Sequence, residues 1–447
     1  MMTTTCIVLA AGEGTRMKSD MPKVMHKLAG RSMLGHVLAN AQTLEPNQIC
    51  VVVGPNMDTV ANEASVAAPA VNIAVQHERL GTGDAVKSAL PVLDHVSQII
   101  IVLFGDTPLV HVATLEKLKG AIAEGAAIAV LGFRADNPHG YGRLLTDTSG
   151  ALTAIREEAD ASEDERQIGL CNSGVMAFDG KLLDQFVSEL ENDNAKGEYY
   201  LTDAVELADS QGLPMAVVEC PEEEVLGVNN RSQLAVAEAV IQNRLRESAM
   251  ENGATLVNPE SVFLSYDTNL GKDVHISPHV VFGVNVTVDD NVNISAFSHL
   301  EGAHIKAGAQ IGPYARLRPG TKIGEGARIG NFVEIKNTEF NAGAKANHLS
   351  YVGDSFVGEN ANIGAGTITC NYDGKNKFRT HIGANAFVGS NSSLIAPVKI
   401  GDGAYIGSSS VITKDVKNGS LALSRAEQRE IPGWAERKTA KQKKSKK

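Results

Sequence analysis

A six-residue repeat in the second half of the chain is the feature that most limits its fold. From about residue 270 an aliphatic side chain recurs at every sixth position, and Gly often follows it, as in IGEGAR, IGANAF and IGDGAY. This period is typical of a parallel β-helix, in which each hexad forms one face of a triangular coil and its aliphatic residue points to the axis. Three hexads make a coil of about 18 residues, so residues 276–416 predict about eight coils. The aliphatic positions are Ile276, Phe282, Val288, Ile294 and Leu300, then Ile305, Ile311, Leu317, Ile323, Ile329 and Ile335, and finally Ile382, Val388, Leu394, Ile400, Ile406 and Ile412.

The repeat is interrupted twice, near 336–351 and at 369–381. The second interruption, TCNYDGKNKFRTH, is polar and rich in turn-forming residues, which predicts a loop that projects from the solenoid. Insertions of this kind tend to gather on a binding face. The repeat does not by itself establish a function, because β-helices also serve as scaffolds.

The first half, residues 5–227, alternates strand-like apolar runs with segments of helical spacing. The apolar runs include TCIVLAAG, ICVVVGP and QIIIVLFGD. This alternation predicts an α/β domain with a mainly parallel sheet and helices on both faces. Functional groups of such sheets lie in the loops beyond the carboxyl ends of the strands. Residues 230–252 have helical apolar spacing, and we interpret them as a linking helix that ends at Gly253.

These patterns divide the chain into a first domain at 1–229, the linker at 230–252, a β-helix domain at 253–430 and a basic tail at 431–447 that we expect to be disordered. The net charge of −11 disfavours nucleic acid as the main partner. We find no apolar window long enough to span a membrane, so no membrane partner is expected. Five widely spaced Cys predict neither a disulfide framework nor a CxxC metal site, which favours a cytoplasmic protein.

A glycine-rich turn follows the first apolar run, in LAAGEGTRM. It lacks the third Gly of a dinucleotide fingerprint and the GK[ST] of a P-loop, which disfavours hydride transfer and P-loop hydrolysis. The turn could present backbone N–H groups to an anion, with Arg16 and Lys23 nearby. Taken alone, a simple strand-to-helix turn explains the pattern equally well.

Further motifs follow this turn in order: Lys23 in MPKVMHKLAG, then QHERLGTGDAV at 76–86, LFGDTPL at 103–109, NPHGYGRL at 137–144, EYYLTD at 198–203 and GVNNR at 227–231. Together they resemble the signature of sugar-phosphate nucleotidyltransferases. With the hexapeptide β-helix behind them, residues 5–430 resemble the family of bifunctional bacterial N-acetylglucosamine-1-phosphate uridyltransferases / glucosamine-1-phosphate acetyltransferases. The resemblance implies a Rossmann-like nucleotidyltransferase domain, a linking helix and a left-handed parallel β-helix.

The resemblance also implies roles for residues of the first half. Arg16 and Lys23 would neutralise phosphate charge, and Asp106 with Asn229 would hold Mg²⁺ through oxygen ligands. Without a metal or a partner, Asp106 could instead be a turn or capping acid. The residues implied to bind UTP or the nucleotide sugar are Leu9, Ala10, Ala11, Gly12, Arg16, Lys23, Gln76, Gly81, Thr82, Phe104, Gly105, Asp106, Gly140, Glu157, Asn172 and Asn229.

The first interruption of the repeat places a His among cations, which suits a substrate that carries both a phosphate and an amine. An amine that attacks a thioester needs a base near neutral pH, for which His is the natural candidate, although a lone His is more often structural. The resemblance implies that His348 is the catalytic base of acetyl transfer. It places Arg318, Lys336, Tyr351, Asn362 and Lys377 at the amino sugar phosphate, and Ala365, Asn371, Tyr372, Ser390, Ser408 and Arg425 at acetyl-CoA.

Three residues depart from the family pattern. Glu13 stands where a basic residue is common, Asp84 where His is common, and Ser408 where Ala is common. The implied enzyme would acetylate glucosamine 1-phosphate with acetyl-CoA and then couple N-acetylglucosamine 1-phosphate to UTP, as a homotrimer. Two alternatives remain at this stage: a nucleotidyltransferase whose β-helix is only a scaffold or regulator, and a non-catalytic assembly subunit with both folds.

Overall fold

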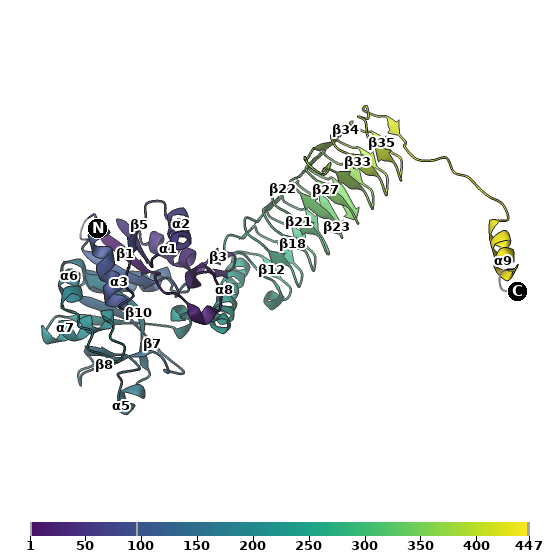
Figure 1. The fold of residues 1–447 in the computed structure, drawn as a ribbon. Helices are drawn as coiled ribbons and strands as arrows, with labels where there is room; N and C mark the ends of the chain where they lie inside the picture. The colour runs from purple at the N-terminus through teal and green to yellow at the C-terminus, as the bar shows by residue number, and fades with distance from the viewer. Residues whose placement is uncertain (1, 95–96, 445–447) are drawn as a thin grey trace. The chain divides into compact units, whose positions relative to one another are not determined.

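The computed structural model describes residues 2–94 and 97–444. The chain forms two compact units, Met1–Arg244 and Leu245–Lys447, and each is described separately below. Figure 1 shows a sheet with helices in the first unit and a stack of short strands in the second. No helix of the described residues is long and apolar enough to cross a membrane.

The first unit is built on a nine-stranded sheet of the described residues, with main order β11-β7-β10-β6-β1-β4-β5. Strand β10 runs antiparallel to its neighbours β6 and β7, and the other pairs along this path are parallel. A hairpin of β8 and β9 extends from β10. The strands are β1 (Thr4–Leu9), β4 (Gln48–Val53), β5 (Asn72–Val75), β6 (Ile99–Phe104), β7 (Ile128–Arg134), β8 (Gly142–Thr146), β9 (Leu152–Arg156), β10 (Leu170–Asp179) and β11 (Met215–Cys220).

Helices cover both faces of this sheet, as the sequence predicts. Successive side chains of a strand point to opposite faces, so Cys6 and Val8 of β1 lie in one apolar cluster, whereas Ile7 and Leu9 lie in another. The first cluster includes residues of α1 (Met33–Thr43), α2 (Asp58–Ala67) and α4 (Val112–Ala123). The second includes residues of α3 (Thr82–Ala89), α6 (Gly180–Glu189) and α7 (Ala204–Ser210). Helix α8 spans Arg231–Glu251, and the division between the two units falls within it.

The second unit is a parallel β-helix whose described strands form three sheets of ten, eight and eight strands. Ile276, Ile294, Ile311 and Ile329 are in register on four successive coils of one sheet, and each is at most 1% exposed. The other aliphatic positions of the repeat are likewise buried in one continuous core. The predicted fold class, a Rossmann-like α/β domain followed by a left-handed β-helix of hexapeptide repeats, is therefore confirmed.

The first predicted interruption, at 336–351, is wrong. Strands β25 (Glu339–Phe340) and β26 (Lys345–His348) continue the coil, and Phe340 and Ala346 pair with Ile323 and Ile329 of the coil before. Both side chains are buried in the axis of the β-helix. An aromatic and a small residue occupy the inward positions here, so a search for aliphatic residues misses a coil that is structurally regular.

The second interruption is a true insertion. After β30 (Ile368–Cys370) the chain leaves the coil, forms an antiparallel bridge between Tyr372 and Lys377, and returns at β31 (Thr380–Ile382). The predicted loop at 369–381 thus carries three of the residues assigned to the acetyl site, Asn371, Tyr372 and Lys377.

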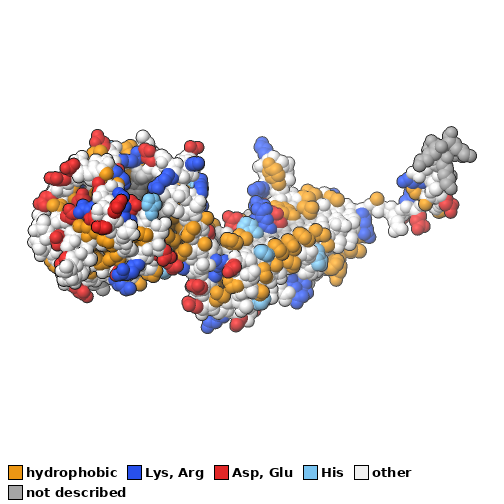
Figure 2. Space-filling view, turned by 90° about the horizontal axis from the view of Figure 1, so that it is seen from below, with side chains coloured by type: hydrophobic (Ala, Val, Ile, Leu, Met, Phe, Trp, Pro, Cys, Tyr) orange, Lys and Arg blue, Asp and Glu red, His pale blue; other side chains and the backbone are white. Residues whose placement is uncertain are grey.

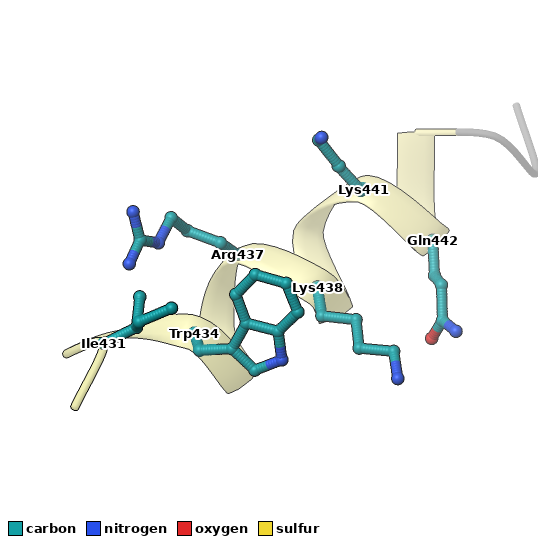
Figure 3. A pocket seen from close by; sticks show the side chains of 6 residues that line it. All are labelled: Ile431, Trp434, Arg437, Lys438, Lys441 and Gln442. Carbon is teal, nitrogen blue, oxygen red and sulfur yellow. The ribbon is translucent and has the colours of Figure 1, made fainter. Parts of the chain in front are cut away.

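Within the basic tail, which we expected to be disordered, residues Trp434–Lys444 form helix α9, and residues 445–447 lie outside the described residues. Ala, Glu, Arg, Lys and Gln dominate this segment, and all are strong helix formers. Figure 3 shows the surface hollow along α9, which is lined by six residues from Ile431 to Gln442 and contains none of the predicted site residues.

Candidate functional site

A cavity of about 200 Å³ lies at the carboxyl ends of β1 and β6. These strands are neighbours, with Leu9 opposite Phe104, so the glycine-rich turn and the loop with Asp106 leave the sheet side by side. The structure thereby gathers ten of the predicted nucleotide residues around one cavity. They are Leu9, Ala10, Ala11, Gly12, Lys23, Gln76, Gly81, Thr82, Phe104 and Asp106.

Two cations and two oxygen-bearing side chains form a connected network at this cavity. Lys23 Nζ pairs with Asp106 Oδ2 and donates to Asn229 Oδ1 at 3.0 Å. Arg16 Nη2 donates to the same Asn229 oxygen at 2.9 Å. The backbone N–H of Val228 donates to the carbonyl of Asp106 at 2.9 Å, which fixes Asn229 beside the Asp106 loop. The residues predicted to bind phosphate, Arg16 and Lys23, therefore lie next to those predicted to bind the metal, Asp106 and Asn229, although they are far apart in the sequence.

The glycine-rich turn is shaped to receive an anion. Gly14 has φ of 67°, and a Cβ on it would lie 2.5 Å from Lys23 Cβ, so only Gly fits at this position. Among the described residues, the backbone N–H groups of 12–16 donate to no protein oxygen. Free N–H groups that converge on a turn create a site for negative charge.

Gln76 is nearly buried, and its orientation is fixed by two acceptors. Its Nε2 donates to the carbonyl of Gly81 at 3.0 Å and to Asp84 Oδ2 at 2.8 Å. A carbonyl and a carboxylate only accept, so the amide nitrogen must face them, and the amide oxygen is the atom left for the cavity that Gln76 lines. Asp84, the departure noted above, therefore supports the cavity wall instead of disturbing it.

Three predicted sugar residues, Gly140, Glu157 and Asn172, lie outside the lining of this cavity. Glu157 follows β9 and accepts a hydrogen bond from Thr202 Oγ1 at 3.2 Å. The segment of Thr202 is tied to the cavity, because the N–H of Leu201 donates to Thr82 Oγ1 at 3.0 Å. Asn172, on β10, accepts from the N–H of Gly174 at 3.0 Å. Burial raises the pKa of the Glu157 carboxyl, despite its hydrogen bond from Thr202.

Asp203 lies close enough to Glu157 and Glu206 to be affected by their charges. Burial together with these two carboxylates raises the pKa of the Asp203 carboxyl to about 6. The folded chain thus binds this proton more tightly than the unfolded chain. Stability from this group is present at low pH and is lost as the pH rises from about 4 through 6. We expect Asp203→Asn to stabilise the first unit by about 1 kcal/mol at pH 7, and by much less at pH 4. Differential scanning calorimetry at both pH values tests this, and equal effects at both would contradict it.

The predicted base of acetyl transfer is held by a residue that sequence reasoning missed. His348 is exposed on β26, and its Nδ1 lies 2.7 Å from Asn331 Oδ1 of β23 (Arg328–Asn331), the strand below. With the amide oxygen accepting from Nδ1–H, the second ring nitrogen, Nε2, carries the free lone pair. The sequence contains a signal for Asn331, because this residue precedes His348 by one coil of the repeat.

Three of the predicted acetyl-CoA residues, Ala365, Ser390 and Ser408, share one corner of the β-helix with His348, whereas Asn371 and Tyr372 lie in the insertion at 369–381. Ala346, Ile363, Val388 and Ile406 are in register on successive coils, and each site residue follows its aligned core residue by two positions. The row that results is Asn331, His348, Ala365, Ser390 and Ser408. Arg425 continues it, since its Nη1 donates to the carbonyl of Ser408 at 3.0 Å. Such a row suits an elongated ligand.

A buried carboxylate, Asp354, organises the remaining acetyl-site residues. It accepts hydrogen bonds from Asn337 at 2.6 Å and from Asn371, and lies 3.9 Å from Lys336 Nζ. Burial would raise the pKa of Asp354, but these amides and the charges of Lys336 and Lys377 outweigh it and lower the pKa. Sequence reasoning missed Asp354, although it holds the insertion to the coil through Asn371.

Tyr351, Arg318 and Asn362 lie on the outside of neighbouring coils. Tyr351 Oη lies 3.4 Å from Asn371 Nδ2, and a Cβ on Gly353 would come within 2.3 Å of that hydroxyl, so Gly353 makes room for the ring. Arg318 pairs with Glu334 at 2.7 Å, one coil below Lys336. Asn362 is paired with Lys345 of β26 on the next coil of the same sheet.

Comparisons with known proteins agree with this picture. The MobA-like NTP transferase domain matches residues 6–168, and the bacterial transferase hexapeptide family matches 302–337 and 379–414. The chain is 58% identical to the bifunctional protein GlmU of Azorhizobium caulinodans, over 96% of each chain. It is 55% identical to that of Paramagnetospirillum magneticum, over 98% of this chain and 96% of the relative.

The fold and the two sites define a nucleotidyltransferase unit joined to a hexapeptide-repeat transferase unit. Relatives of this similarity, which match almost the whole chain, identify the particular family. The chain belongs to the GlmU family of bifunctional proteins.

Proposed function

We propose that this chain makes UDP-N-acetylglucosamine in two steps, one in each unit. The second unit acetylates glucosamine 1-phosphate with acetyl-CoA, and the first transfers UMP from UTP to the product and releases pyrophosphate. The observation that carries the proposal is the network of Arg16, Lys23, Asp106 and Asn229 beside the glycine-rich turn. Membership of a family of bifunctional transferases supports both activities.

In uridylyl transfer, a phosphate oxygen of the sugar attacks the α-phosphorus of UTP, and the bond to the bridging oxygen of pyrophosphate breaks. Such transfers depend mainly on alignment and on neutralisation of charge. Lys23 and Arg16 supply positive charge, and the free N–H groups of the turn donate hydrogen bonds to phosphate oxygens. Gln76 presents its amide oxygen to the N3–H of uracil, and Gly81 and Thr82 form the adjacent wall.

Asp106 and Asn229 fit a magnesium ion. Their side-chain oxygens already converge on one cation, the Lys23 ammonium, and Mg²⁺ prefers few protein oxygens supplemented by phosphate and water. The described residues contain no cluster of three or more His, Cys, Asp or Glu suited to a metal, so phosphate oxygens must supply part of the coordination. A bound Mg²⁺ would neutralise phosphate charge in the transition state.

In acetyl transfer, the 2-amino group of glucosamine 1-phosphate attacks the thioester carbonyl, a C–N bond forms and the C–S bond breaks. We propose that His348 Nε2 takes the proton from the amine, while Asn331 holds the ring in the required tautomer. Arg318 and Lys336, on adjacent coils, would bind the phosphate, and Tyr351, Asn362 and Lys377 the sugar. The corner row from Ala365 to Ser408, with Asn371, Tyr372 and Arg425, would receive CoA.

The direct test is to assay the purified full chain for both reactions. With UTP, N-acetylglucosamine 1-phosphate and Mg²⁺ it should release pyrophosphate, and with acetyl-CoA and glucosamine 1-phosphate it should release free CoA thiol. Pyrophosphate release without acetyl transfer would establish the β-helix as a scaffold. If the chain catalysed neither reaction, the assembly-subunit alternative would be established.

We also propose that the chain forms a homotrimer through one corner of the β-helix. His279, Phe297, Tyr314 and Phe332 stack on successive coils with ring centroids 4.9 to 5.1 Å apart, and Leu349 extends the row. These apolar side chains are about half exposed, and a continuous row of this kind marks an interface. Figure 2 shows hydrophobic side chains gathered in a band over the β-helix. Phe332 and Leu349 directly follow Asn331 and His348, so a neighbouring copy would adjoin the acetyl site.

Replacing Phe297 and Phe332 by Asp tests this assembly. The two charges would be desolvated by a partner, so light scattering should show the mass falling from trimer to monomer, with acetyl transfer lost and uridylyl transfer retained. Val66→Asp is the matched control, because Val66 is an isolated exposed side chain on α2. An unchanged trimer in the double variant would contradict the proposal.

A further inference from the structure

One ion pair beside the nucleotide cavity has no part in the function derived above. Arg79 Nε donates to the carbonyl of Ala11 at 2.8 Å, and Arg79 Nη1 pairs with Glu13 Oε1 at 2.5 Å. The pair joins the glycine-rich turn to the segment between Gln76 and Gly81, and the adjacent residues Gly12, Gln76 and Gly81 line the cavity.

The Arg79 guanidinium is fixed beside the cavity by its neighbours. Its anchor, Ala11, lines the cavity, and its Nη2 occupies space beside Gly54, where a Cβ would come within 2.7 Å. Gly54 follows β4, which is the neighbour of β1 in the sheet. Arg79 is thus placed at the edge of the turn whose N–H groups face an anion, with only part of its donor capacity used by the Ala11 carbonyl.

The net charge of the side chains around the turn depends on Arg79. Lys23 already faces Asp106, and Glu13 adds a second negative charge to the turn itself. Without Arg79 these two acids would offset Arg16 and Lys23, although the proposed substrate brings a highly charged triphosphate to the same place. A positive local charge favours binding of such an anion.

The ion pair is also accessible enough for a phosphate to replace Glu13 as the partner of Arg79. The Glu13 side chain is 60% exposed and that of Arg79 is 37% exposed, and ion pairs this accessible contribute little to stability. A phosphate carries more charge than a carboxylate and can accept two parallel hydrogen bonds from a guanidinium. A phosphate could therefore displace Glu13 while the Ala11 carbonyl keeps Arg79 in place.

We propose that Arg79 is a third cation for the triphosphate of UTP and that Glu13 is its intramolecular counter-ion, displaced when the phosphates bind. This inference rests on the proposed uridylyl transfer. A purely structural role of the pair predicts the opposite effect on UTP binding when the charge of Glu13 is removed. Removing the charge of Glu13 should strengthen binding of UTP if Glu13 competes with phosphate, and should weaken it if the pair only holds the two loops together.

The test is a double-mutant cycle in the full chain, with the KM for UTP and for N-acetylglucosamine 1-phosphate measured in pyrophosphate release. We expect Glu13→Gln to lower the KM for UTP about 3- to 10-fold and Arg79→Gln to raise it about 10-fold, with the KM for the sugar phosphate nearly unchanged. In the double variant, the Glu13 substitution should have no further effect. Titration of each variant with UTP alone, by calorimetry, should give the same order.

Two controls separate the outcomes. Arg134→Gln removes an exposed arginine that pairs with Glu219 elsewhere in the same unit, and it should leave both KM values unchanged. Thermal unfolding of the same preparations, followed by circular dichroism, reports whether the first unit is folded in each variant. A raised KM for UTP in Glu13→Gln, or the same Glu13 effect with and without Arg79, would overturn the inference. Absence of pyrophosphate release in the parent chain would instead overturn the proposed function.

Discussion

His348→Ala is expected to lower kcat for acetyl transfer by about 10²–10⁴-fold, because the variant lacks the base proposed to take the proton from the attacking amine. The KM for acetyl-CoA should change little, since the corner row from Ala365 to Ser408 remains. Uridylyl transfer by the same protein should be unaffected, because none of the residues around its cavity comes from the β-helix. Release of free CoA thiol and release of pyrophosphate measure the two activities separately.

His299→Ala is the matched control for this variant. His299 is likewise exposed on a strand of the β-helix, β18 (His299–Leu300), but it is not part of the row of His348. Both activities should survive its loss. Acetyl transfer at the parental rate in His348→Ala would show that His348 is not the base. A reduced rate that rises with pH would instead show that deprotonation of the amine by solvent replaces the missing base. A complete pH profile of the variant distinguishes these results.

Asp106→Asn is expected to reduce pyrophosphate release by about 10²–10³-fold and to leave acetyl transfer intact. The substitution keeps the shape of the side chain but removes the negative charge that pairs with Lys23 and that would hold Mg²⁺. The freed ammonium then lacks its partner at the point where Asn229 also converges. Steady-state kinetics over a range of Mg²⁺ concentrations should show a raised metal requirement along with the lower kcat.

Asp184→Asn provides the comparison for that experiment. Asp184 is an exposed residue of α6 in the same unit, and its loss should change neither reaction. If Asp106→Asn releases pyrophosphate at the parent rate and with the parent metal dependence, Asp106 is a turn acid. The network at the glycine-rich turn would then have to act through Arg16 and Lys23 alone.

Local patterns were sufficient to predict most of the architecture. A buried side chain at every sixth position leaves few alternatives to a β-helix, and successive strand-like runs with helical segments predict a covered parallel sheet. The exception at 336–351 is instructive. Phe340 and Ala346 fill inward positions as well as Ile does, because what the axis requires is an apolar side chain of suitable volume, and neighbouring coils adjust to the difference.

The candidate sites were predictable where a motif is contiguous and were not where a partner comes from another part of the chain. Arg16, Lys23 and Asp106 lie in recognisable segments, and the sheet brings them together. Asn331 lies 17 residues from His348, Asn371 lies 17 residues from Asp354, and Arg79 lies 66 residues from Glu13. In the sequence, Asn331, Asp354 and Arg79 look like ordinary polar side chains.

The sequence by itself thus determined the repeat, the two kinds of domain and the residue types available for phosphate and amine chemistry. It could do so because burial acts on every residue of a strand or coil and leaves a periodic record. Only the tertiary structure decided which carboxylate faces which cation, which amide orients His348 and which glycines make room for Lys23 and Tyr351. Those relations depend on register between strands and on the separation of single atoms, which hydrophobic periodicity does not encode.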